Sequence, residues 1–347
     1  MPENRSFVLY KPGDLRYEER EIPRPGPGEI VVKVGASGLC PSDIKTYRHG
    51  SSYARYPVVL GHEFAGTVYR VGEGVDVVKE GDRVNITAAA YCGYCRMCRR
   101  GLEHLCDNIL NFGYNVDGAH ADYVLVPRQF IPRGIFRIPD SLSFEVASMT
   151  EPFADVVHSV TLGGVGPDVS VAIVGDGPMG MLHIIASRAF GATKITPIGL
   201  TDWKLRLAEE LGATRTINAR FYKPADELRN DRADAVFLTV VSSETLEEAF
   251  SIANKGGRIV IFAGVPKGSV TYTLDPNSVH YNGAYLMGSI GYTYQEYAKA
   301  LALIENGAPL EKLISHRIEL QNFMDAIGIW DNKEISMKVI ITRKSSS

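Results

Sequence analysis

Four of the chain's five cysteines lie close together, at Cys92, Cys95, Cys98 and Cys106. Four thiolates at such short spacing can surround one tetrahedral zinc ion and leave it no open position. Disulfides are rare inside cells, so we do not expect the four to pair with one another. Free cysteines and an iron–sulfur cluster are the alternatives, but the ferredoxin pattern has a shorter last gap, followed by proline. The spacing therefore predicts a structural zinc site.

The fifth cysteine, Cys40, lies in the segment GLCPSDI, and potential partners for a second metal follow it. His62 and Glu63 stand side by side in GHEFAG, and Glu151 begins EPF. A catalytic zinc uses about three protein ligands and keeps one position open, and a thiolate, an imidazole and a carboxylate meet that need. A lone cysteine is more often a core residue. The combination predicts a catalytic zinc.

A glycine motif in the second half of the chain predicts dinucleotide binding. Gly175, Gly177 and Gly180 form G-x-G-x-x-G between an apolar, strand-like run and a helix-like run. In that context the backbone N–H groups of the turn and of the helix N-terminus face a pyrophosphate, and Pro178 and Met179 lie at this helix N-terminus. Strand and helix patterns continue to alternate beyond the motif. This alternation predicts an α/β fold with a doubly wound parallel sheet.

The end of the second predicted strand bears on the choice of dinucleotide. Folds that bind NAD usually place an acidic residue there, roughly 20 residues past the glycine turn, to hold the ribose 2′-hydroxyl. Gly199 occupies this place, so we predict NADP in preference to NAD. Thr201, Lys204 and Arg206 are near enough in sequence to contact a phosphate, whereas Asp202 would restore the preference for NAD if the loop turned it inward.

Composition predicts a small-molecule partner. The net charge of -3 and the pI near 6.3 give no basic footprint for a nucleic acid or an anionic membrane. No stretch approaches the roughly 20 apolar residues of a membrane span, and the first residues lack the pattern of a signal peptide. A chain of 347 residues is long enough for two cores. We expect a cytoplasmic protein of two domains.

Taken in order, GLCPSDI, GHEFAG, GDRV, the four-cysteine segment, GAHADYV, EPF and the glycine motif resemble the zinc-dependent medium-chain dehydrogenase/reductase family. The resemblance covers nearly the whole chain. It implies a GroES-like, partly open β-barrel catalytic domain over residues 1–155 and a Rossmann domain over 156–288. Residues 289–347 would return to the catalytic domain, with the active site in the cleft between the domains. It also implies a homotetramer or homodimer, and residues 258–274 could supply the pairing edge strand.

The resemblance also implies a role for each candidate ligand. Cys40 and His62 would bind the catalytic zinc, with Glu63 and Glu151 sharing the carboxylate position. Alcohol dehydrogenases of the liver type use a second cysteine after the four-cysteine lobe, and this sequence has none beyond Cys106. The third ligand is therefore expected to be a carboxylate, as in the polyol and threonine branches. The choice between the two glutamates stays open.

Ser42 and Asp43 follow Cys40 directly after Pro41. In the family, a serine or threonine here bonds the substrate hydroxyl and starts a proton relay, and the aspartate orients the zinc-binding histidine. Either residue could also cap a helix that starts at this point. The parts together imply hydride transfer between a secondary alcohol and the nicotinamide of NAD(P), with zinc as the Lewis acid.

The substrate is the least specified part. The carboxylate-rich zinc site and the polar segment TYRHGSSYARY resemble polyol and sugar dehydrogenases, so His49, Tyr53 and Arg55 are candidates for binding hydroxyls. They could equally be exposed loop residues. L-Threonine 3-dehydrogenase is the nearest rival, although that branch usually has Asp-Pro-Phe-Gly where residues 151–154 read EPFA. A non-catalytic, zinc-stabilised nucleotide-binding protein is the alternative outside the enzymes.

Overall fold

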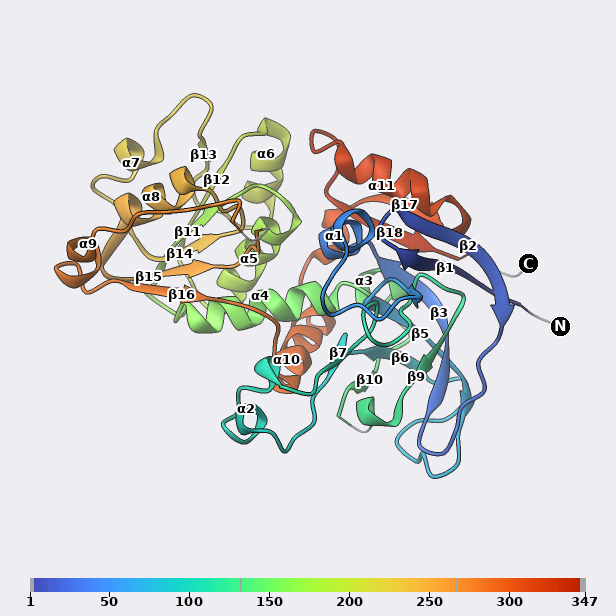
Figure 1. The fold of residues 1–347 in the computed structure, drawn as a ribbon. Helices are drawn as coiled ribbons and strands as arrows, with labels where there is room; N and C mark the ends of the chain where they lie inside the picture. The colour runs from blue at the N-terminus through green and yellow to red at the C-terminus, as the bar shows by residue number, and fades with distance from the viewer. Residues whose placement is uncertain (1–2, 132, 266–267, 344–347) are drawn as a thin grey trace. The chain divides into compact units, whose positions relative to one another are not determined.

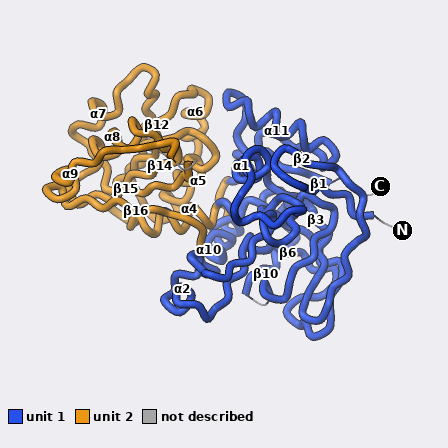
Figure 2. Tube along the Cα trace, in the orientation of Figure 1, with its two compact units in different colours: residues 1–152, 293–306, 310–347 blue, residues 153–292, 307–309 orange. Residues whose placement is uncertain are grey.

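The computed structural model describes residues 3–131, 133–265 and 268–343. The chain divides into two compact units (Figure 2). Unit 1 comprises residues up to 152, residues 293–306 and residues from 310 onward, and unit 2 comprises residues 153–292 and 307–309. The chain passes from unit 1 to unit 2 within α4 (Thr150–Leu162). Its C-terminal part therefore shares a unit with its N-terminal part.

Unit 1 is built mainly of β-strands. Its larger sheet has the order β10-β6-β5-β3-β18-β17, with β9 also paired to β3, and β2-β1-β4 form a smaller sheet. The strands are β1 (Glu3–Lys11), β2 (Asp14–Glu21), β3 (Ile30–Gly38), β4 (Val58–Val59), β5 (Glu63–Val71), β6 (Arg83–Ile86), β9 (Tyr123–Val126), β10 (Ile135–Arg137), β17 (Ile314–Glu319) and β18 (Lys338–Thr342). The register of β3 against β5 shifts twice, and such bulges bend a strand. The sheet is that of the predicted GroES-like barrel.

The sequence of β3 explains why it lies inside unit 1. Ile30, Val32 and Val34 alternate along the strand and are fully buried, so one face of the sheet packs on an apolar core. The same core includes Phe64, Val68, Val84, Ile86, Phe112 and Phe130. The remaining elements of this unit are α1 (Pro41–His49), β7 (Ala89–Ala90), α2 (Arg96–Arg99), β8 (Leu110–Asn111), α3 (Phe144–Ala147), α10 (Tyr294–Glu305) and α11 (Phe323–Asp331).

Unit 2 holds one parallel sheet with the order β13-β12-β11-β14-β15-β16 (Figure 1). Its strands are β11 (Ser170–Val174), β12 (Lys194–Gly199), β13 (Ile217–Asn218), β14 (Ala233–Leu238), β15 (Ala253–Ile261) and β16 (Tyr285–Gly288). Counted along the chain this is the order 3-2-1-4-5-6 of a Rossmann sheet, so the prediction of a doubly wound fold is confirmed. The helices are α5 (Pro178–Ala189), α6 (Asp202–Glu210), α7 (Pro224–Glu227), α8 (Ser243–Ile252) and α9 (Pro276–His280).

Residues 258–274 do not supply the predicted edge. Their strand portion belongs to β15, which pairs with β14 on one side and β16 on the other, while residues 266 and 267 lie outside the described residues. Among the strands of the described residues, β13 and β16 form the edges of this sheet. β16 has only four residues, YLMG, so only the structure reveals that the chain returns to add it beyond β15. No helix in the described part is long and apolar enough to cross a bilayer.

Candidate active site

Three predicted metal ligands meet in unit 1. Cys40 directly precedes α1, and His62 and Glu63 stand where the chain enters β5. The sulfur, a ring nitrogen and a carboxylate oxygen of these residues all lie within 4.8 Å of one another. Glu151, near the start of α4, is also buried, but it is not a member of this group. The structure therefore gathers one soft, one borderline and one hard ligand.

The Asp43 carboxylate contacts residues of this cluster and fixes their positions. Its carboxylate accepts hydrogen bonds from the backbone N–H groups of Cys40 and Gly61, both at 3.2 Å, and Oδ1 lies 3.4 Å from Nδ1 of His62. Gly61 has a φ of 98°, which only glycine adopts readily. Burial raises the pKa of Asp43, but His62 and a hydrogen bond from His120 outweigh it and hold that pKa well below its usual range. An anionic carboxylate at Nδ1 leaves Nε2 of His62 as the nitrogen that a metal ion could bind.

His120 supports Asp43 in turn, and sequence reasoning assigned it no role. Its Nε2 lies 3.2 Å from Oδ2 of Asp43, and its Nδ1 lies 3.2 Å from Oγ of Ser37, which accepts a hydrogen bond from Arg343 at 3.0 Å. Burial lowers the pKa of His120, so the ring is neutral. Because a carboxylate only accepts, Nε2 must donate to Asp43. A connected series of hydrogen bonds thus fixes the carboxylate.

Glu63 has a second buried partner. Its Oε2 pairs with the ammonium group of Lys338 in β18, which also donates to the carbonyl oxygen of Leu39 at 3.3 Å. A Cβ at Gly38 would overlap the Glu63 carboxylate, so glycine makes room for the pair. Burial lowers the pKa of Lys338, but Glu63 and the thiolate of Cys40 outweigh it and raise that pKa. Each member of this buried ion pair thus has a partner of opposite charge.

Two hydroxyl groups lie beside the same cluster. Ser42 donates a hydrogen bond to the Cys40 sulfur at 3.0 Å and lies 3.4 Å from Nε2 of His62. The Tyr114 ring packs near the His62 ring, with centroids 6.0 Å apart. Burial raises the pKa of Tyr114, and His62 and Ser42 partly offset the rise. No spacing signal in the sequence pointed to Tyr114.

The side chains of the predicted substrate-binding residues lie outside the cluster of Cys40, His62 and Glu63. The side chains of His49, Tyr53 and Arg55 are exposed, Tyr53 by 69%. The backbone N–H of Arg55 donates to the carbonyl oxygen of Tyr114 at 2.8 Å, which ties this segment to the cluster through its main chain. In the part of the chain that the structure describes, none of the three side chains bonds to a member of the cluster.

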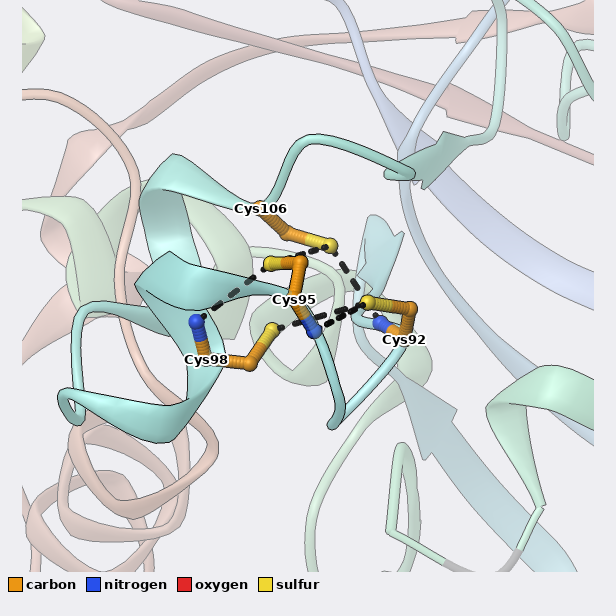
Figure 3. Close-up of side chains that lie close together, drawn as sticks. All are labelled: Cys92, Cys95, Cys98 and Cys106. Carbon is orange, nitrogen blue, oxygen red and sulfur yellow. Dashed lines mark hydrogen bonds between the residues drawn. The ribbon is translucent and has the colours of Figure 1, made fainter.

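The four-cysteine segment brings its sulfurs together (Figure 3). Cys92 and Cys98 have sulfurs 4.0 Å apart, as do Cys95 and Cys106. A tetrahedral zinc with sulfurs at about 2.3 Å requires separations of about 3.8 Å, so the donor set fits. Desolvation raises the pKa of Cys92, but backbone N–H groups bonded to its sulfur outweigh it and lower that pKa to about 6. These hydrogen bonds stabilise the thiolate form that binds metal.

The glycine turn of unit 2 connects β11 to α5. A Cβ at Gly180 would overlap the carbonyl oxygen of Gly175, so the helix packs closely on the turn, whereas a Cβ at Gly177 would meet nothing within 4 Å. Pro178 and Met179 are the first residues of α5. The open space at Gly177, next to a helix N-terminus, fits a pyrophosphate group.

The second strand of that sheet ends at Gly199. Thr201 precedes α6, and Lys204, within α6, is only 4% exposed. Asp202 accepts a hydrogen bond from the Asn218 side chain at 2.6 Å, which turns its carboxylate toward β13. The structure therefore places these residues around the end of β12, with Lys204 inside the protein.

Comparison with known proteins agrees with both the GroES-like domain and the Rossmann domain. Residues 26–140 match the alcohol dehydrogenase GroES-like domain, and residues 178–306 match the zinc-binding dehydrogenase family. Sorbitol dehydrogenase of Bacillus subtilis (strain 168) is 31% identical over 94% of this chain and 94% of its own. L-Threonine 3-dehydrogenase of Caldanaerobacter subterraneus subsp. tengcongensis is 33% identical over 90% of each chain.

Solved structures agree over almost the whole chain. A zinc-binding dehydrogenase of Sinorhizobium meliloti 1021 bound to NADP has a TM-score of 0.91 at 30% identity, covering 99% of this chain and 100% of its own. An alcohol dehydrogenase of E. coli CFT073 in complex with NADH has a TM-score of 0.90 at 26% identity, with the same coverage. The chain belongs to the zinc-dependent medium-chain dehydrogenase/reductase family. It is an NAD(P)-dependent alcohol dehydrogenase of the branch that includes polyol and threonine dehydrogenases.

Proposed function

We propose that this enzyme oxidises a secondary alcohol of a polyol or sugar-like substrate and transfers the hydride to NAD(P). The observation that carries the proposal is the close approach of half-buried Cys40 to buried His62 and Glu63, with Ser42 beside them. A zinc ion held there supplies a Lewis acid that polarises the alcohol oxygen. The hydrogen on the carbinol carbon would pass to the nicotinamide ring as hydride, one proton with two electrons, and the hydroxyl proton would leave separately.

The residues around the cluster have different roles in the proposed reaction. Asp43 holds His62 so that Nε2 is presented, and Lys338 forms an ion pair with the Glu63 carboxylate. Ser42, 3.4 Å from that nitrogen, is placed to orient the substrate hydroxyl and to pass its proton on. Glu63 is proposed as the third ligand, since it is the carboxylate within reach of both other ligands.

We propose two zinc ions per chain. The second is held by the four cysteines, whose complete ligand set gives it a structural role only. Assembly into a homotetramer or homodimer and a cytoplasmic location stay predictions of the family resemblance. A preference for NADP stays a prediction that depends on Gly199.

The groups next to the cluster favour a neutral substrate. Ser42 and Tyr114 offer hydroxyls, which suit the hydroxyl groups of a polyol. An amino acid would require a cation for its carboxylate, and Lys338 is already paired with Glu63. Threonine is nevertheless the second candidate, because L-threonine 3-dehydrogenases are among the relatives.

Turnover of a substrate panel tests the proposal. Zinc-loaded wild type and Cys40→Ser are assayed with sorbitol, 2,3-butanediol and L-threonine, each with NAD and NADP, by formation of reduced nicotinamide. We expect a polyol to be oxidised by wild type and the rate to fall to background in the variant, because one zinc ligand is lost. Fastest turnover of L-threonine would establish the second candidate. No turnover of any secondary alcohol by zinc-loaded wild type would contradict catalysis.

A further inference from the structure

One carboxylate of the glycine turn has an unusual position. Asp176 lies between Gly175 and Gly177, and its side chain crosses from β11 to the end of β12. Its Oδ2 accepts hydrogen bonds from the backbone N–H groups of Leu200 and Thr201, both at 2.8 Å. Its Oδ1 has no hydrogen bond to any residue that the structure describes. A half-buried carboxylate, anchored by one oxygen, therefore stands at the end of the second strand.

Gly199 and Asp176 are complementary in shape. A Cβ at Gly199 would lie 2.6 Å from the Cβ of Asp176 and 2.8 Å from its Oδ2, distances that real side chains do not show. The φ of Gly199 is not in the left-handed region, so space rather than backbone conformation requires glycine here. Gly199 thus makes room for a carboxylate from the turn, instead of leaving this position without one.

We propose that Asp176 replaces the acidic residue that NAD-binding folds carry at the end of the second strand, and that it selects NAD over NADP. The inference rests on the proposed function, since it concerns the dinucleotide of the same reaction. Oδ1 of Asp176 accepts a hydrogen bond from an adenosine ribose hydroxyl, as the missing residue at position 199 would. This proposal reverses the preference predicted from Gly199 alone.

Two features of the site oppose a 2′-phosphate. Such a group carries a charge of about −1.5 to −2 at neutral pH, and here it would meet the carboxylate of Asp176. The N–H groups of Leu200 and Thr201, which would otherwise be donors for it, are already bonded to Oδ2. A neighbouring cation exists, because Arg220 donates to the carbonyl oxygen of Leu200 at 2.8 Å. Removal of the carboxylate would therefore leave two N–H donors and an arginine where a phosphate could bind.

Equilibrium binding of NAD and NADP to the full chain tests the proposal without reference to turnover. Isothermal titration of wild type, Asp176→Ala and Asp176→Asn gives the ratio of the two dissociation constants. We expect wild type to bind NAD at least about tenfold more tightly than NADP, and Asp176→Ala to lower that ratio at least about tenfold. Asp176→Asn removes the charge but keeps the side-chain size, so its ratio should also fall.

Asp202→Asn is the matched control. It removes one negative charge next to the same turn, from a carboxylate that bonds Asn218 instead, so the wild-type ratio should persist. Equal shifts in Asp202→Asn and Asp176→Ala would overturn the role of Asp176, as would wild type binding NADP as tightly as NAD. The latter result needs no variant to fold. Wild type that binds neither dinucleotide would instead refute the proposed function.

Discussion

At the scale of single residues, the cluster of Cys40, His62 and Glu63 contains a carboxylate whose charge is balanced by a neighbouring lysine. Lys338 is buried beside an equally buried Glu63, and the charge of each stabilises the other. Removing one partner of such a pair leaves an uncompensated charge, which typically costs about 3–5 kcal/mol. A zinc ion at the cluster would supply positive charge to the same carboxylate. The cost of losing Lys338 should therefore depend on metal.

We predict that Lys338→Met lowers the free energy of unfolding by about 3 kcal/mol in chelator-treated protein and by clearly less in zinc-loaded protein. Thermal unfolding with and without zinc measures both values. Lys338→Arg keeps the positive charge and should resemble wild type in both states. If Lys338→Met were destabilised equally with and without zinc, Glu63 would not be a ligand of the metal.

At the scale of elements, part of the four-cysteine segment has little apolar packing. Its helix α2 has no buried residue, and Arg96, Arg99 and Arg100 are exposed. Backbone N–H groups point at the sulfurs of Cys92 and Cys95 rather than at an apolar core. In such a segment the free energy of metal binding becomes free energy of folding.

We predict that Cys98→Ser exposes this segment to trypsin. Cleavage after Arg96, Arg99 or Arg100 should be at least about tenfold faster than in wild type, because loss of a thiolate ligand weakens zinc binding and the segment opens. Peptide mapping by mass spectrometry locates the cuts. Cys40→Ser is the matched control and should leave these sites protected. Equal protection in Cys98→Ser and wild type would mean that packing alone holds the segment.

The sequence predicted those elements whose signal is local. Periodicity and the glycine motif predicted the parallel sheet of unit 2, and motif order predicted the barrel of unit 1. The ligand types at Cys40, His62 and Glu63 predicted a cluster that the structure assembles. The misplaced edge strand shows the limit, since pairing of β15 with β16 depends on where the chain returns after α9.

Side chains that act across elements were not predictable by spacing. His120 reaches Asp43 from 77 positions away in sequence, and Tyr114 meets His62 only in the folded barrel. The sequence did not predict a role for Asp176. The rule for dinucleotide choice considers the residue at the end of the second strand, whereas the Asp176 carboxylate reaches that place from the turn after the first strand. Such contacts depend on tertiary packing, which produces no regular spacing of residues in the sequence.

At the scale of the whole molecule, the chemistry is divided between the two units. Unit 1 contains both cysteine-based clusters, and unit 2 contains the glycine turn with Asp176. Metal content and dinucleotide binding can therefore be measured independently in one chain. A variant that loses the catalytic metal should still bind dinucleotide, because none of the residues proposed to bind that metal belongs to unit 2.

The most direct test of the account is zinc content per chain in wild type and Cys40→Ser, by mass spectrometry of metal, with dinucleotide binding as the check on folding. The account predicts two zinc ions in wild type and one in the variant, with turnover lost and dinucleotide binding kept. One zinc ion in both proteins, with no turnover in either, would show that Cys40 is a core thiol and that the chain is not a zinc-dependent dehydrogenase.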